Sequence, residues 1–230
     1  MIEKYYNGVI EQVAGGIGNV EHNSILVRYS NDFSIWDLES VNHYKDQSDI
    51  FFTCHEFSYN KIAEAYEPYL GLIRQMFHKY CSGTLEEFME ECDVYKLQRP
   101  VFESYFEKGF CERTEQILID EVEYEQERMH SSIVTMLQKL SEICPIVIVL
   151  NRFQLASKST MQLTNRLLQT KNKNIGIVLG VNDVQSIPEF AHEEWDAICE
   201  SMDDRNMVYH IGNAGRNMEP DVMDYYSDYE

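Results

Sequence analysis

The sequence has little positive charge and no arrangement of cysteine and histidine that would hold a structural metal. Its 39 acidic residues outnumber 19 basic ones, which gives a formal net charge of −20. A surface of this charge repels phosphate backbones and anionic lipid headgroups, so we expect no direct contact with nucleic acid or membrane. The six cysteines show neither a CxxC pair nor zinc-ligand spacing, so no metal site is expected.

Long apolar runs are also missing. None approaches the roughly 18 residues that a membrane-spanning helix needs, and no basic and apolar leader opens the chain at Met1. We therefore expect a cytoplasmic protein with reduced thiols. The 230 residues suffice for one large core but not comfortably for two.

Five short apolar runs have the length of β-strands. They cover residues 24–30, 49–55, 145–150, 174–180 and 207–213. Runs such as IVIVL and IGIVLG do not alternate with polar residues, so helices should cover both faces of these strands. The pattern predicts a three-layer α/β domain with about five mainly parallel strands, joined by right-handed crossovers.

Helical patterns fill most of the remaining sequence. They cover residues 1–14, 34–47, 60–110, 114–144, 159–171 and 189–204. The third of these should contain three helices, and in it Thr84 and Glu87 form a capping-box signature. We expect one domain over residues 1–215, with a helical insertion at about 60–144. The acidic, tyrosine-rich stretch 216–230 is expected to be a disordered tail or linker.

One stretch carries a resemblance to a known family. It reads MLQKLSEICPIVIVLNRFQLASKSTMQLTNRLLQTKNKNIGIVLGVND and leads from a helix into an apolar strand, a corner at 153–156, a second helix and a second strand. In this order, and in the FQLA corner, it resembles the middle of STAND-type P-loop NTPases, the AAA-like ATPase modules of bacterial signalling and transcription regulators. The resemblance implies a P-loop-NTPase-like fold for the domain.

A working member of that family needs a glycine-rich phosphate loop, GxxxxGK[ST], after its first strand. If the first apolar run is that strand, the required glycines, lysine and hydroxyl residue fall at Arg28, Phe33, Ser34 and Ile35. None of the required residue types is present. Asp32 would moreover point a carboxylate toward the phosphate position, and Phe33 would block close approach of the backbone.

The family also needs two acids at the end of the apolar strand 145–150, which hold magnesium and polarise the attacking water. Asn151 and Arg152 stand there instead. Asparagine has no charge to bind a hard cation, and a guanidinium cannot accept a proton at physiological pH. Two structural explanations remain as alternatives to a lost function. In one, Arg152 pairs with a nearby acid, and in the other, Asn151 caps the turn.

These losses predict a non-hydrolysing regulatory or scaffolding pseudo-NTPase domain of a bacterial signalling protein, with no catalytic residue and no cofactor. It would act through a protein partner or through downstream domains of the same chain, with self-association as a further option. The alternative is an ATP-binding STAND-type ATPase or nucleotide sensor that uses ATP and magnesium through an atypical phosphate loop. Its contacts would come from Arg28, Ser30, Ser34, Asn151, Arg152 and Asn182.

Other candidate chemistry is weaker. Cys54 and His55 end the second predicted strand, but neighbouring strand residues point to opposite faces, so no nucleophilic dyad is expected. His192 and Glu193 resemble the start of an HExxH zinc helix, but Asp196 stands where the second histidine belongs. The 15 tyrosines and 11 phenylalanines mainly indicate a core, with an exposed aromatic groove for a protein partner as the alternative.

Overall fold

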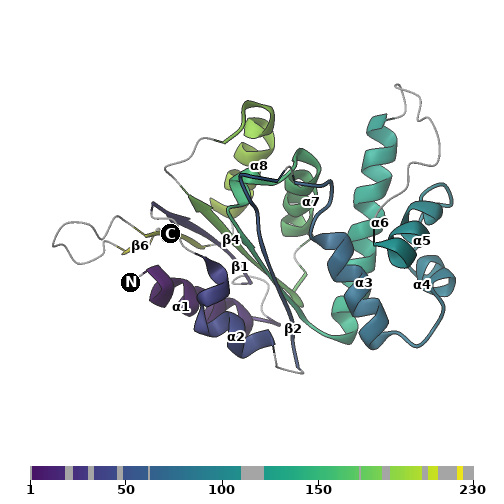
Figure 1. Cartoon of the computed structure of the whole chain (residues 1–230), viewed down its shortest axis with the longest axis horizontal. Helices are drawn as coiled ribbons and strands as arrows, with labels where there is room; N and C mark the ends of the chain where they lie inside the picture. The colour runs from purple at the N-terminus through teal and green to yellow at the C-terminus, as the bar shows by residue number, and fades with distance from the viewer. Residues whose placement is uncertain are drawn as a thin grey trace, which may run out of the picture.

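The computed structural model of the chain is an α/β domain in which helices cover both faces of a central sheet (Figure 1). It describes residues 2–18, 23–30, 34–45, 49–61, 63–109, 122–170, 172–182, 187–203, 207–211 and 222–224. The predicted three-layer α/β class is confirmed. Asp32 and Phe33, on which part of the phosphate-loop argument depends, lie outside the described residues, as do 110–121 of the insertion.

The sheet has the strand order β2-β3-β4-β1-β5-β6. Its strands are β1 (Ser24–Tyr29), β2 (Phe51–Glu56), β3 (Ile146–Asn151), β4 (Ile175–Asn182), β5 (Met207–Ile211) and β6 (Val222–Asp224). Strands β2, β3, β4 and β1 pair in parallel with one another, and β5 pairs in parallel with β1. β6 pairs antiparallel with β5. The sheet therefore has a parallel body, as predicted, and a sixth strand from the stretch expected to be a tail.

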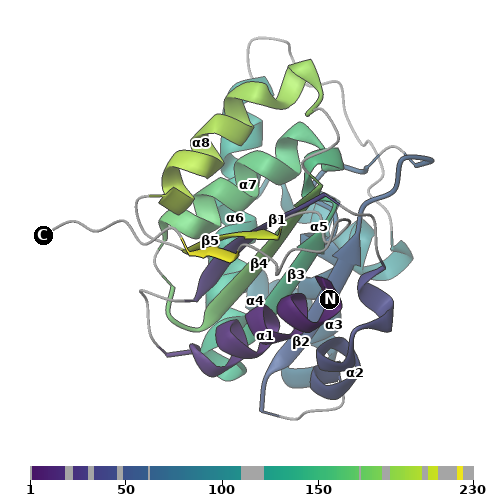
Figure 2. The same cartoon turned by 90° about the vertical axis from the view of Figure 1, so that its left-hand side faces the viewer.

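The central strands are apolar because the sheet is covered on both sides. Every residue of β3 and of β4 is buried. On one face lie α1 (Ile2–Gly15) and α2 (Glu39–Lys45), and on the other lie α7 (Lys158–Gln169) and α8 (His192–Asp203) (Figure 2). Two apolar cores follow, one on each side of the sheet, as expected for strands with no polar alternation.

The insertion between β2 and β3 consists of helices beside the sheet, at the right in Figure 1. Its helices are α3 (Tyr69–Tyr80), α4 (Leu85–Glu91), α5 (Arg99–Lys108) and α6 (Val122–Ile143). The predicted capping box at α4 is confirmed, with both the Thr84 and the Glu87 side chain bonded to main-chain N–H groups. The ring of Phe77 joins three of these helices, since it lies 5.2 Å from that of Phe88 and 5.5 Å from that of Phe106.

Two helix boundaries differ from the prediction. The first helix of the insertion starts at Tyr69 rather than near Asn60, because Pro68 lacks an N–H group and disfavours helical backbone at Glu67. Ser34 caps its helical segment as predicted, but that segment is only the 3-10 turn η1 (Ile35–Asp37). The backbone is extended at Leu38, and α2 begins after it.

Candidate functional site

The candidate site lies at the carboxyl edge of the parallel strands, on the face that carries α1 and α2. β1 ends at Tyr29, β2 at Glu56 and β3 at Asn151. The registers align these positions, because Glu56 is the partner of Asn151 and Tyr29 is the partner of Asn182. This edge is where open α/β sheets usually gather ligands.

Glu56 is the centre of this edge. Its Oε2 accepts a hydrogen bond from the main-chain N–H of Ile35 at 3.2 Å and lies 3.5 Å from Oγ of Ser34. Its Oε1 lies 2.9 Å from Nη1 of Arg152, and both side chains are largely buried, with 10% and 19% exposed. The carboxylate thus lies at the start of the turn after β1, on the N–H group that begins η1. In a phosphate loop, groups of this kind receive phosphate oxygens.

Arg152 is held in place rather than directed at an open site. Its backbone is in the left-handed region, with φ 53° and ψ 42°. The guanidinium carbon lies 5.8 Å from the ring centroid of Tyr59, in addition to the ion pair with Glu56. The simple interpretation, that Arg152 pairs with a nearby acid, is therefore confirmed.

Asn151 lies fully buried beside Arg152 but has different partners. Its Oδ1 accepts a hydrogen bond from Oη of Tyr29 at 2.8 Å, so this side chain joins β3 to β1 instead of capping the turn. Among the described residues, its Nδ2 has no hydrogen-bond partner. A Cβ at Gly180 would come within 2.6 Å of that Oδ1 and would also meet Oη of Tyr6. Glycine is therefore required at this point of β4.

The FQLA corner after β3 fixes the end of β4. Gln154 is buried, and its Oε1 accepts a hydrogen bond from the main-chain N–H of Asn182 at 3.3 Å. Phe153 is buried too, and its ring lies 6.1 Å from that of Phe57. The corner therefore serves the packing of the sheet edge.

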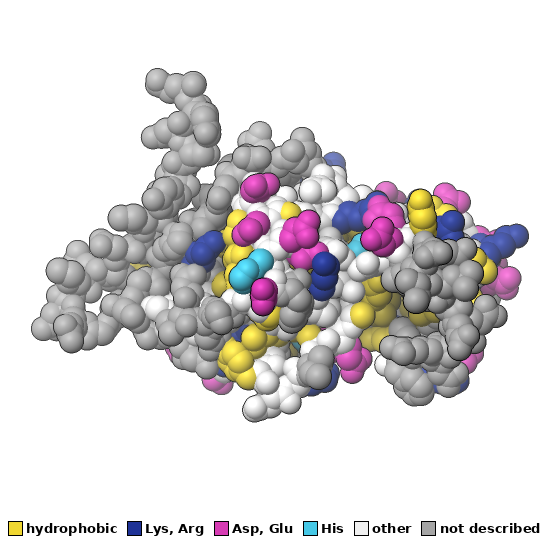
Figure 3. All heavy atoms as spheres, turned by 90° about the horizontal axis from the view of Figure 1, so that it is seen from above, with side chains coloured by type: hydrophobic (Ala, Val, Ile, Leu, Met, Phe, Trp, Pro, Cys, Tyr) yellow, Lys and Arg dark blue, Asp and Glu magenta, His cyan; other side chains and the backbone are white. Residues whose placement is uncertain are grey.

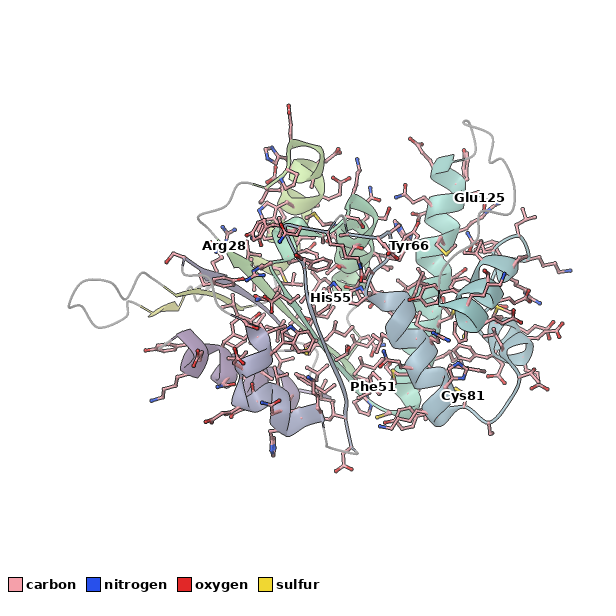
Figure 4. The ribbon with its side chains drawn as sticks, in the orientation of Figure 1. Arg28, Phe51, His55, Tyr66, Cys81 and Glu125 are labelled. Atoms are coloured by element: carbon pink, nitrogen blue, oxygen red, sulfur yellow. The ribbon has the colours of Figure 1, made fainter. Side chains whose placement is uncertain are left out.

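Arg28 is separated from this group by the sheet. Its Nη2 lies 3.4 Å from Sγ of Cys199, and its guanidinium carbon lies 5.6 Å from the ring centroid of Trp195, both residues of α8. Figure 4 labels Arg28, which lies on the side of the sheet away from the helical insertion. Tyr29, the next residue, packs in the core on the α1 side. Of the six residues named for the alternative, the structure joins Ser34 to Arg152 through Glu56. Asn151 bonds to Tyr29 and Asn182 to Gln154, Ser30 is half-buried just after β1, and Arg28 contacts α8.

Cys54 and His55 point to opposite faces, as the alternation predicts. Cys54 packs against the α1-side core, whereas the ring of His55 lies 4.5 Å from Phe57, a residue of the other core. Burial raises the pKa of the Cys54 thiol to about 11. Burial also lowers the pKa of His55, although Glu67 at 4.0 Å opposes this shift. A thiol that holds its proton at neutral pH, on the opposite face of the strand from His55, makes a poor nucleophile.

The zinc-like start of α8 also has structural contacts. Nε2 of His192 lies 2.9 Å from the main-chain oxygen of Ile187, and Glu194 pairs with Lys158 at 3.0 Å. Within the described part of the chain, no group of three His, Cys, Asp or Glu side chains is placed to hold a metal ion. No described helix is long and apolar enough to cross a membrane.

Glu56, Tyr29 and Gln154 belong to this edge and were not predicted from the sequence as site residues. The second strand was predicted to end at His55, one residue before Glu56. Extending that strand by one residue would have paired Glu56 with Asn151.

No protein-family model matches the chain, and no curated protein is significantly similar to it.

Proposed function

We propose that the chain is a non-hydrolysing regulatory or scaffolding domain, related to the STAND-type pseudo-NTPases, that acts through protein contacts. The observation that carries the proposal is the position of the Glu56 carboxylate. It accepts the Ile35 N–H group and pairs with Arg152, so it takes the role that a phosphate oxygen would have at the turn after β1.

Electrostatics supports the same conclusion. A nucleotide phosphate at this turn would be placed next to a carboxylate, and like charges at close range in a partly buried site repel strongly. It would also have to displace the Glu56–Arg152 pair, whose side chains are 10% and 19% exposed. Arg28, the other cation considered for phosphate, is engaged with Cys199 and Trp195.

The absence of acids at the tip of β3 points in the same direction. Asn151 is fully buried and hydrogen-bonded to Tyr29, and Arg152 carries a positive charge. Neither side chain holds magnesium well or activates water, which are the two tasks of that position in phosphoryl transfer.

Titration with ATP, ADP and GTP, with and without magnesium, tests this proposal. We expect no heat of binding and no rise in Tm at millimolar nucleotide, whereas a ligand at 100 times its Kd would stabilise by about 2.7 kcal/mol. Glu56→Gln is the matched variant, because it keeps the shape of the side chain and removes the charge. We expect inorganic phosphate to raise the Tm of Glu56→Gln but not that of the wild-type chain.

Micromolar binding of a nucleotide to the wild-type chain would overturn the proposal in favour of the sensor alternative. Phosphate stabilising both forms equally would show that Glu56 does not occupy the anion position. For the scaffolding role, light scattering of the intact chain over a range of concentrations reports on self-association.

A further inference from the structure

The outer edge of the sheet at β2 is unpaired in the described part of the chain. β2 is the first strand in the order β2-β3-β4-β1-β5-β6, so among the described strands only β3 pairs with it. In Figure 1, β2 lies in front of the other strands, with α2 on one side of it and α3 on the other. Its last four residues, 53–56, are all partly exposed. A sheet edge of this kind is a template for a further strand.

The directions of the main-chain groups follow from the bonds at the two ends of β2. The N–H of Phe51 donates to the main-chain oxygen of Pro145 at 2.7 Å. The N–H of Phe57 donates to that of Asn151 at 3.1 Å. Because the main-chain groups of a strand alternate in direction, the odd-numbered residues of β2 face β3 and the even-numbered ones face outward. The outward residues are Phe52, Cys54 and Glu56. Within the described ranges, nothing bonds to their main-chain N–H and C=O groups.

β2 also lacks the features with which proteins usually protect a sheet edge. It contains no proline, and its register with β3 runs from Phe51 to Glu56 without a bulge. The carboxylate of Glu56 is turned back onto Arg152 and the N–H group of Ile35 in the same chain. The strand itself therefore carries nothing that would prevent pairing.

The two ends of this edge differ on the face of α2. At the carboxyl end, Trp36 is 46% exposed and follows Ile35, whose N–H group binds Glu56. At the amino end, the ring of Phe52 stacks on that of Tyr44, with centroids 5.7 Å apart. An exposed indole is surface of the kind that protein interfaces bury. A second copy in antiparallel orientation would bring each Trp36 toward the Tyr44–Phe52 pair of the other copy.

Charge differs between the two ends on the face of α3. At the amino end, Nζ of Lys79 lies 5.6 Å from the ring centroid of Phe51. Toward the carboxyl end, Oε1 of Glu67 lies 4.0 Å from Nε2 of His55 and 3.3 Å from Nζ of Lys61. Two copies in antiparallel orientation would therefore place the lysine end of one edge beside the glutamate end of the other, which is electrostatically complementary.

We propose that the β2 edge pairs with the β2 edge of a second copy of this chain, in antiparallel orientation centred on Cys54. Phe52 then lies opposite Glu56 of the other copy, and Cys54 lies opposite its own counterpart. The residues of each such pair exchange two N–H···O=C bonds, so the sheet continues from one copy into the other. A twofold contact of this kind uses the same surface on both copies, as in the commonest symmetric oligomers.

This inference rests on the proposed scaffolding role, because it names one partner for it, but the two can fail separately. A chain that dimerises through β2 and also binds nucleotide would contradict only the proposed function. A chain that binds neither nucleotide nor a second copy would contradict only the pairing of β2.

Amide hydrogen exchange, followed by NMR over a range of chain concentrations, tests the pairing on the wild-type chain. We expect the amide protons of Phe52, Cys54 and Glu56 to become protected as the concentration rises into the range where sedimentation shows a dimer. The N–H groups of Thr53 and His55 face β3 within each copy, so they should be protected at every concentration and serve as internal controls. A mixture of labelled and unlabelled chains should show contacts between Phe52 of one copy and Glu56 of the other.

Two substitutions of Cys54 isolate the main-chain bond. Cys54→Pro and Cys54→Ala both remove the thiol, but only proline also removes the N–H group. Since that N–H group faces away from β3, the proline breaks no bond within the sheet of one copy. We expect Cys54→Pro to weaken dimerisation at least about tenfold, because the two central hydrogen bonds are lost. Cys54→Ala should dimerise like the wild-type chain.

Several results would each overturn the proposal. They are a monomer at every concentration, a dimer of unchanged affinity in Cys54→Pro, and a dimer that leaves the three outward amides unprotected. Protection of these amides that does not depend on concentration would also overturn it, because another segment of the same chain would then cover the edge. The exchange measurement needs no substitution, so it tests the pairing even if Cys54→Pro fails to fold.

Discussion

Glu56 connects two loops through one carboxylate, with one oxygen on the turn after β1 and the other on the corner after β3. Asn151, one residue before Arg152, connects the strands that precede these loops, β3 and β1, through its hydrogen bond with Tyr29. The residues at this edge are therefore held by each other. Substituting one of these residues should first lower the stability of the fold.

We predict that Glu56→Gln lowers the free energy of unfolding by about 2 kcal/mol. This lies between the small value of exposed ion pairs, about 0–1 kcal/mol, and the 3–5 kcal/mol lost when one partner of a buried pair is removed. Urea denaturation measures the change. Glu142→Gln breaks an exposed pair, with side chains 46% and 67% exposed, and should cost less than about 0.5 kcal/mol. Equal losses in both variants would contradict the central position of Glu56.

Gly180 gives a second prediction at this scale. Gly180→Ala should destabilise by about 1–3 kcal/mol, because its new methyl group meets Asn151 and Tyr6 in a closed core. Gly8→Ala is the control, since Gly8 lies in α1 with nothing near a Cβ, and it should stabilise by up to about 1 kcal/mol. Adding Tyr6→Phe to Gly180→Ala should restore part of the loss. Thermal unfolding of these three variants and the wild-type chain measures the differences.

Among the elements, α4 is defined most clearly by its own sequence. It is only seven residues long, so its end groups make up much of its hydrogen bonding. We predict that Thr84→Ala costs about 1 kcal/mol, because the N–H of Glu87 loses its acceptor. Thr84→Ser keeps the hydroxyl oxygen and should stay within a few tenths of a kcal/mol of the wild-type chain. Chemical denaturation compares them, and equal losses in both variants would speak against the cap.

The elements also show what the sequence could and could not predict. β3 and β4 were predictable because uninterrupted apolar runs need cover on both faces, and the α4 cap because its motif is local. The late start of α3 depends on Pro68, and the break at Leu38 depends on packing beyond the local pattern. β6 is held by pairing with β5. The Glu56 contact joins residues from three separate segments, and no spacing within one segment encodes it.

At the scale of the whole molecule, the excess of acids is the dominant electrostatic feature. Asp and Glu side chains gather on the face seen from above, over α7 and α8 (Figure 3). The helix α8 begins with Glu193 and Glu194 and has no basic residue in its last turn. Folding brings these like charges together, so self-repulsion opposes the compact state.

We predict that added salt stabilises the chain. Raising sodium chloride from about 0.01 M to about 0.15 M shortens the screening length from about 30 Å to about 8 Å. We expect Tm to rise by about 2–4 °C, equal to about 1 kcal/mol of relieved repulsion in a domain of this size. Potassium chloride should act equally, and Glu193→Gln should reduce the effect. A fall in Tm with salt would mean that internal ion pairs outweigh the repulsion.

The placement of the insertion has a consequence for how the chain reaches its final state. β2 and β3 are neighbours in the sheet, yet residues 57–145 intervene between their paired ends. β3 and β4 are joined through the short segment around α7 alone. Closing the longer loop costs more chain entropy and relies on contacts between distant residues, which slows pairing. Folding should therefore begin in the unit from β3 to β4, and β2 should dock onto it late, once the intervening helices have collapsed.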